Sequence, residues 1–128
     1  MMKSSRLYHM VLAGVLCAVG IVVPMFMPRI VLGPMSFTLA SHVAVFLGMF
    51  ISPAVAVAVC IGTTLGFFLT TPAIIALRAA SHIVFAGLGA LYLKKHPDTI
   101  DRPVASTVFN FVIALLHAAA EMIVVAPF

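Results

Sequence analysis

The sequence predicts an all-α fold, a polytopic bundle of helices that span a membrane. The main observation is composition: 64% of the 128 residues are hydrophobic and only 8% are charged, whereas soluble domains are about half apolar and a quarter charged. In addition, the apolar residues form runs close to the ~20 residues that a spanning helix needs. Basic residues flank these runs, as they do in proteins whose orientation follows charge. We therefore expect one transmembrane domain over residues 1–128.

Five apolar segments are candidates for spanning helices. The first follows the basic start MMKSSR and resembles a signal peptide, but its cleavage pattern is weak, so we expect it to stay in the protein. The second and third segments are short and are separated only by Ile51-Ser52-Pro53, which fits a tight hairpin or a pair of tilted helices. The connection before the second segment contains several prolines. Because proline breaks helices, we expect this connection to be non-helical. The five segments are residues 7–27, 37–51, 53–70, 72–93 and 104–126.

The positions of the basic residues predict the orientation. Lys3 and Arg6 place the N-terminus in the cytoplasm under the positive-inside rule. With five spans, the loop of residues 94–103 also lies inside, and it carries three basic residues. We therefore assign the net charge of +4 to membrane orientation rather than to a nucleic-acid partner. The expected location is the cell membrane, with the lipid bilayer around several spans.

Two segments carry small residues four positions apart, a spacing that allows helix backbones to approach closely in lipid. In the segment of residues 53–70 we expect this stripe to pack inside the bundle. For the small residues of the first segment, two interpretations stay open: packing inside the bundle, or a face that docks a partner protein. The stripe in residues 53–70 consists of Ala54, Ala58, Gly62 and Gly66. The candidate docking residues in the first segment are Ala13, Gly14, Cys17 and Ala18.

Polar side chains interrupt three of the predicted spans. On a helix with 100° per residue, Asn110, His117 and Glu121 fall within about 20° of one line. Arg78 and His82 are one turn apart in the fourth segment. Ionisable groups at membrane depth cost about 2.5–3.5 kcal/mol on insertion scales, so they should face an interior with partners. The second segment adds Thr38, Ser41 and His42.

Two interpretations of the charged pair Arg78 and Glu121 stay open. Intramembrane charges commonly pair, so these two could simply hold the bundle together. Alternatively, they border a cavity in which Arg78 would hold a carboxylate through two parallel hydrogen bonds. Glu121 could then fix the tautomer of His117, whereas His42 alone is more typical of a satisfied interior histidine. The candidate substrate-binding residues are Arg78, His82, Asn110, His117, Glu121 and His42.

Sequence motifs of enzymes and metal sites are absent. The chain has no glycine-rich phosphate loop, nucleophile elbow or HExxH helix. Neither Cys17 nor Cys60 has a second cysteine or a histidine at ligand spacing. We therefore expect no catalysis, no cofactor and no metal. A small proton-coupled carrier and a structural membrane subunit remain alternatives to a binding protein, although carriers usually show repeated halves.

The order of these features resembles the S components of energy-coupling factor (ECF) transporters, the small membrane subunits that capture vitamins. The first helix contains "LAGVLCAVG", and the outer loop reads "MPRIVLGPMSFTLASH". The stretch "VAVFLGMFISPAVAVAVCIGTTLGFFLTTP" resembles the family's short helix, Gly/Pro junction and Gly-rich helix. "GPMSFTL" is similar to the biotin-binding branch, while "HAAAE" with Arg78 is more similar to branches that bind acidic heterocycles such as niacin.

The resemblance implies a function for each of these regions. The chain would capture a small water-soluble vitamin or related metabolite from the outer face, with residues 28–36 as a lid. Its first helix would dock, through the four residues named above, on a transmembrane coupling subunit powered by two cytoplasmic ATPase subunits. The ATP chemistry would belong to those partners, so the chain itself would not be an enzyme. Family members normally have six helices; we expect five here, with a sixth in the complete protein as the alternative.

Overall fold

The computed structural model describes residues 4–33, 35–38 and 40–128. This part of the chain is mainly helical, and four of the five predicted segments coincide with long helices to within a few residues. The prediction of an all-helical membrane bundle is confirmed. The elements are α1 (Ser4–Phe26), β1 (Arg29–Leu32), β2 (Met35–Thr38), α2 (Val43–Ile51), α3 (Pro53–Thr70), α4 (Ala73–Lys95), the short 3-10 helix η1 (Pro97–Thr99) and α5 (Pro103–Val125).

The segment predicted over residues 37–51 is different. Only its last nine residues form a helix, α2, which is about 14 Å long at 1.5 Å per residue and therefore about half the thickness of a bilayer core. Residues 35–38 instead pair with residues 29–32 in an antiparallel hairpin. Gly33, with a φ of 59°, lies at its turn, a conformation that glycine adopts without steric cost. The prediction of five spanning helices is not confirmed.

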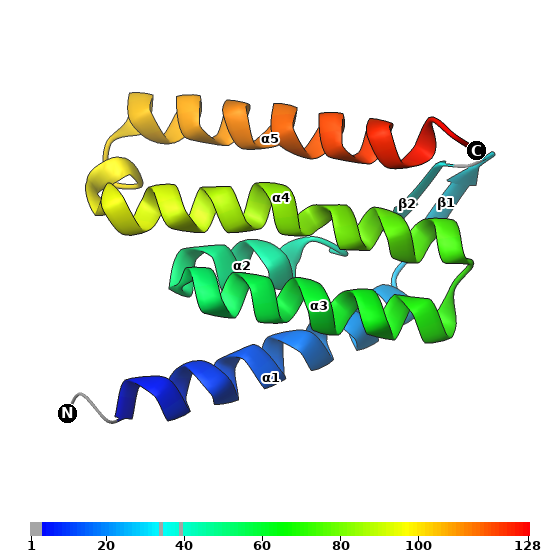
Figure 1. Cartoon of the computed structure of the whole chain (residues 1–128), viewed down its shortest axis with the longest axis horizontal. Helices are drawn as coiled ribbons and strands as arrows, with labels where there is room; N and C mark the ends of the chain where they lie inside the picture. Colours follow the sequence, from blue (N-terminus) through cyan, green and yellow to red (C-terminus); the bar gives the residue numbers. More distant parts are fainter. Residues whose placement is uncertain (1–3, 34, 39) are drawn as a thin grey trace.

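Four helices in the described part of the chain are long and apolar enough to cross a membrane, namely α1, α3, α4 and α5. They lie roughly side by side, with α1 at one edge of the bundle and α5 at the other (Figure 1). Helix α4 lies between α3 and α5, while α1 packs on α2 and α3. Helix α2 occupies only the half of the bundle in which α1 begins. The segment before α2 therefore ends near the middle of the bundle.

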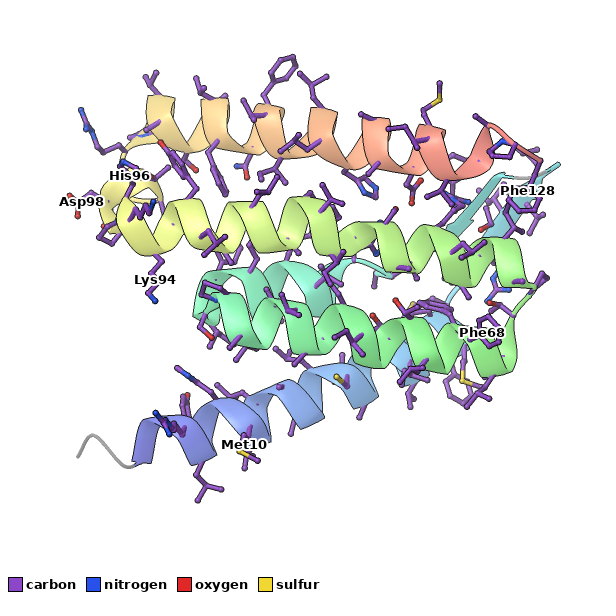
Figure 2. The ribbon with its side chains drawn as sticks, viewed as in Figure 1. Met10, Phe68, Lys94, His96, Asp98 and Phe128 are labelled. Atoms are coloured by element: carbon purple, nitrogen blue, oxygen red, sulfur yellow. The ribbon has the colours of Figure 1, made fainter. Side chains whose placement is uncertain are left out.

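The two ends of the bundle differ in charge. Lys94, His96 and Asp98 lie at the end where α1 begins, and Phe128 lies at the opposite end with the hairpin (Figures 1 and 2). The chain passes between these ends so that the start of α1 and the loop of residues 94–103 share one end. This is the arrangement that the basic residues predicted, although which end faces the cytoplasm remains a prediction.

Small residues bring α1 and α3 close together, as expected for a glycine stripe. A methyl group at Gly62 would collide with the side chain of Cys17, and one at Gly66 would collide with Ile21. The Cys17 thiol donates a hydrogen bond to the carbonyl oxygen of Ala58 at 3.5 Å. The stripe on α3 is therefore confirmed as an internal packing surface at these positions.

The predicted docking residues on α1 do not share one face. Cys17 points toward α3, and Ala13 packs against the hydrophobic core. Gly14 and Ala18 are exposed. The spacing suggested one smooth surface, but α3 uses part of it. Gly14 and Ala18 are the more exposed two of the four residues, and a contact of this surface with another protein stays a prediction.

Candidate functional site

The candidate site is formed where α4 and α5 pack together near the hairpin. Arg78 and His82 are four residues apart on α4, and His117 and Glu121 are four residues apart on α5. Residues at this spacing lie on the same side of a helix. Because the two helices run antiparallel and side by side, the two pairs face each other.

Arg78 and Glu121 form an ion pair between the two helices. The Nη2 of Arg78 donates to Oε2 of Glu121 at 2.8 Å, and the two side chains are 11% and 19% exposed. The Nη1 of Arg78 donates to the carbonyl and hydroxyl oxygens of Ser36 on β2, each at 3.3 Å. Arg78 therefore links α5 to the hairpin, and the paired arrangement that the sequence left open is present.

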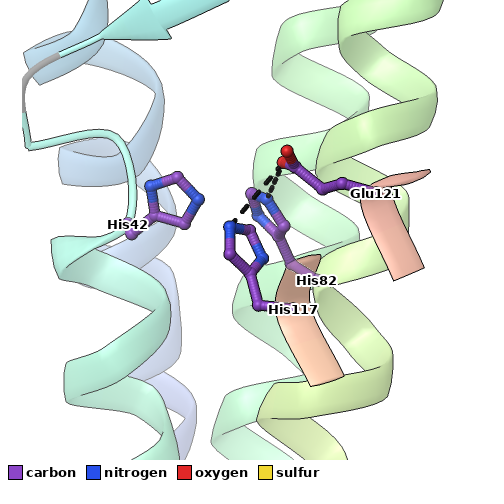
Figure 3. A group of neighbouring side chains, drawn as sticks. All are labelled: His42, His82, His117 and Glu121. Atoms are coloured by element: carbon purple, nitrogen blue, oxygen red, sulfur yellow. Dashed lines mark hydrogen bonds and ion pairs between the residues drawn. The ribbon is translucent and has the colours of Figure 1, made fainter. Parts of the chain in front are cut away.

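Three histidines lie directly beside this ion pair. His42 precedes α2, His82 belongs to α4 and His117 to α5, and their rings converge with Glu121 in Figure 3. The ring centres are separated by 4.5 Å, 4.8 Å and 5.1 Å. The Nε2 atoms of His82 and His117 lie 3.3 Å and 3.8 Å from Oε1 of Glu121. Three segments distant in the sequence thus meet in one cluster.

Several polar atoms of the site are buried without a hydrogen-bond partner in the described part of the chain. They are Nε2 of His42, Nδ1 of His117 and Nε of Arg78. The other ring nitrogen of His42, Nδ1, lies 2.9 Å from the hydroxyl oxygen of Ser41. A buried polar atom without a partner costs about 1–3 kcal/mol. The cluster therefore has unused capacity to bind a polar atom.

The cavity at the site is small. It has a volume of about 40 Å³, which is enough for about three water molecules but not for a heterocyclic vitamin. The cavity is partly open but narrow, so a larger ligand would need the ion pair or the hairpin to move. The polar residues that line the cavity are Ser36, Thr38, Ser41, His42, Arg78, His82 and Glu121.

The structure brings five of the six predicted binding residues together and leaves Asn110 out. Asn110 is exposed and lies two turns from His117, toward the other end of α5. The inward side of α5 follows the four-residue ridge through Phe109, Ile113, His117 and Glu121, and the first two of these are buried. Such a ridge is inclined to the helix axis. Asn110 shares a line parallel to the axis with His117, but it lies beside the ridge.

Ser36 is a contact that sequence reasoning missed. It binds Arg78 from the hairpin, where the sequence predicted only an outer loop. A signal was present, because Gly33 and Pro34 separate the runs RIVL and MSFT, and a Gly-containing turn between strand-forming residues is typical of a hairpin.

Comparison with known proteins gives one informative similarity. The chain is 41% identical over 98% of its length to the niacin transporter NiaX of Lactococcus lactis subsp. cremoris (strain MG1363), and it spans 58% of that protein's length. No protein-family model matches the chain. No solved structure matches it. The chain is therefore homologous to part of a membrane transport protein, which agrees with the predicted resemblance to a family of vitamin transporters.

Proposed function

We propose that the chain is the substrate-capture region of an ECF-type importer and that it binds a pyridine carboxylate of the niacin type. The observation that carries this proposal is the cluster of Arg78, Glu121 and three histidines next to the hairpin, in a chain homologous to a niacin transporter. A guanidinium can hold a planar carboxylate through two parallel hydrogen bonds. The imidazole rings can stack on a heteroaromatic ring or share a hydrogen bond with it.

The ion pair suggests how a ligand would be held. Arg78 now uses Nη2 for Glu121 and Nη1 for Ser36. A ligand carboxylate would replace these oxygens and accept two parallel hydrogen bonds from the guanidinium. Glu121 would keep the imidazoles of His82 and His117 beside Oε1. The exchange leaves the Glu121 carboxylate without its guanidinium, so its charge would need another positive partner, such as a proton taken up with the ligand.

The hairpin is the element that would open. Its described contacts with Arg78 are the two 3.3 Å hydrogen bonds through Ser36, and ordinary hydrogen bonds contribute only about 0.5–1.5 kcal/mol each. Moving β1 and β2 therefore costs less than separating helices. Arg6, Lys94, Lys95 and Arg102 lie at the opposite end of the bundle, whereas Arg29 is on the hairpin. The positive-inside rule therefore favours an outer position for the hairpin. This matches a lid over residues 28–36.

The proposed partners are a transmembrane coupling subunit and two cytoplasmic ATPase subunits. Gly14 and Ala18 on α1 are the exposed small residues that would contact the coupling subunit. Uptake would draw its energy from the ATPases, and the chain itself would carry out no chemical step.

A comparison of two ligands tests the proposal. Purified protein in detergent micelles should bind nicotinate in calorimetric titration, whereas nicotinamide, which has the same ring but no carboxylate, should bind at least tenfold more weakly. Arg78→Ala should weaken nicotinate binding about 10- to 100-fold, since hydrogen bonds to charged groups contribute about 1.5–3 kcal/mol. Arg102→Ala, at an exposed arginine just before α5, is the matched control and should bind normally. Equal affinity for the two ligands would contradict the proposal.

A structural role for the ion pair is the second candidate, and the 2.8 Å contact together with the small cavity favours it. In that case Arg78→Ala should unfold the protein and Arg78→Ala/Glu121→Ala should restore the fold. Nicotinate should then bind to none of the folded forms. Retained folding of Arg78→Ala with lost nicotinate binding would support the capture function instead.

A further inference from the structure

Four side chains at the site present metal-ligand atoms to one common point. One ligand atom each from His42, His82, His117 and Glu121 lies within 4.8 Å of the other three. The residues come from the segment before α2, from α4 and from α5 (Figure 3). From this convergence we propose that the cluster is a binding site for a divalent transition metal of the kind that prefers imidazole, with Zn²⁺ as the best match.

The geometry is close to that of a tetrahedral zinc site. Zn–N and Zn–O bonds of about 2.0–2.1 Å place tetrahedral ligand atoms roughly 3.3 Å apart. The widest pair in the cluster would thus need to close by about 1.5 Å, which small side-chain rotations can provide. Histidine nitrogens and carboxylate oxygens are both zinc ligands, and some zinc sites use three histidines or two histidines and a glutamate. The cavity of about 40 Å³ beside them can hold an ion together with a water molecule.

His42 is oriented as a metal ligand would be. Its Nδ1 is fixed by the hydroxyl of Ser41 at 2.9 Å, and its Nε2 is buried without a hydrogen-bond partner among the described residues. Ligating histidines almost always use the second ring nitrogen for such an outer hydrogen bond, which sets the ring orientation. His117 likewise has an unpartnered nitrogen, Nδ1. A bound metal could give these buried nitrogens a partner.

The two oxygens of Glu121 have separate partners, so Arg78 does not block the site. Oε2 accepts the hydrogen bond from Arg78, whereas Oε1 is the atom that His82 and His117 approach. A metal would bind Oε1 while Arg78 keeps Oε2, and the carboxylate would lie between the two positive charges. In this arrangement Arg78 is an outer partner of the site, which orients Glu121 without binding the metal.

The inference concerns the same cluster as the proposed function but goes beyond it. Metal binding requires the imidazoles and Oε1 of Glu121, whereas capture of a carboxylate requires the guanidinium of Arg78. The two can therefore be separated by substitution. Arg78→Ala should retain metal binding even if it loses nicotinate.

The experiment uses the full chain in detergent with any affinity tag removed, because a polyhistidine tag would itself bind metal. Co²⁺ is titrated without any vitamin, and the visible ligand-field absorption is recorded. Competition with Zn²⁺ then gives the zinc affinity. We expect one metal ion per chain and the intense absorption of four-coordinate Co²⁺. The stoichiometry is checked by elemental analysis of protein separated from free metal.

Variants connect the signal to the cluster. His117→Gln should lower Zn²⁺ affinity more than about 100-fold, because removing only an outer partner of a metal ligand already costs 10- to 100-fold. Ser41→Ala should lower Zn²⁺ affinity by about 10- to 100-fold, because Ser41 is an outer partner of His42. His96→Gln is the matched control, since this exposed histidine lies at the opposite end of the bundle. Equal zinc binding by His117→Gln and His96→Gln would overturn the inference, as would folded protein that gives no four-coordinate Co²⁺ spectrum. Either result would overturn the metal site and leave the proposal of nicotinate binding standing.

Discussion

The two outer helices of the bundle are attached in different ways. At the contact of α1 with α3, glycines let the backbones approach until an added methyl group would collide with the opposite helix. At the hairpin end of the contact of α4 with α5, two charged residues and two histidines meet across the interface. The first contact depends on shape and the second on charge. The close glycine contact is most sensitive to an added atom, whereas a charge pair is most sensitive to the loss of one partner.

The largest effect should come from breaking the charged contact on one side only. Glu121→Ala leaves the mostly buried guanidinium of Arg78 without its anion, and removing one partner of a buried pair costs about 3–5 kcal/mol. The double variant Arg78→Ala/Glu121→Ala should be more stable than Glu121→Ala, because it leaves no uncompensated charge. Reversible unfolding by denaturant in mixed micelles measures both free energies. A double variant less stable than Glu121→Ala would mean that Arg78 stabilises the bundle through another contact.

The second-largest loss of stability should come from added volume at the glycine contact between α1 and α3. Gly62→Ala places a methyl group against Cys17 of α1, and overpacking typically costs about 1–3 kcal/mol. Cys17→Ala removes the colliding sulfur and should recover part of this loss in the double variant. Gly87→Ala is the matched control on α4, because its added methyl group meets no atom within 4 Å. The same denaturant titration measures the free energy of unfolding of both variants. Equal losses of stability for Gly62→Ala and Gly87→Ala would show that close packing against α1 is not the cause.

The two contacts also differ in how well the sequence predicted them. The glycine stripe is visible in one segment, since a spacing of four residues describes a helix face whatever packs on it. The boundaries of α3 were likewise predicted, because Ser52 and Pro53 form a local start signal: the Ser52 hydroxyl accepts a hydrogen bond from the backbone N–H of Val55 at 3.2 Å. Such features depend on neighbours in the chain and can be found without coordinates.

The polar cluster could be predicted only in part. The pairs on α4 and α5 follow from the four-residue spacing, but their meeting with His42 depends on a turn in which Ala40 adopts a φ of 62° and on a helix only nine residues long. Neither feature has a clear sequence pattern. The expectation of no metal came from spacing within single segments, so it could not register a cluster of candidate ligands contributed by three segments.

The hairpin should contribute less to stability than either helix contact. Ser36→Ala removes the hydroxyl that accepts a hydrogen bond from Arg78 but keeps the carbonyl oxygen that accepts another. We expect a loss of about 0.5–1.5 kcal/mol and faster release of a bound ligand in stopped-flow measurements. A loss as large as that of Glu121→Ala would show that the hairpin, and not the ion pair, holds this end of the bundle closed.

The smallest effect is expected at the polar residue that lies outside both contacts. Asn110 is exposed on α5, whereas its neighbour Phe109 is buried and stacks on Tyr92 with ring centres 5.6 Å apart. Asn110→Leu should leave the affinities for nicotinate and Zn²⁺ unchanged. It should change the free energy of unfolding by less than about 0.5 kcal/mol, as substitutions away from packed or paired groups usually do. Phe109→Leu, one residue away, should cost more because it removes part of a buried ring. If Asn110→Leu instead abolished ligand binding, the binding surface would follow the line through Asn110, and the ridge ending in Glu121 would not define it.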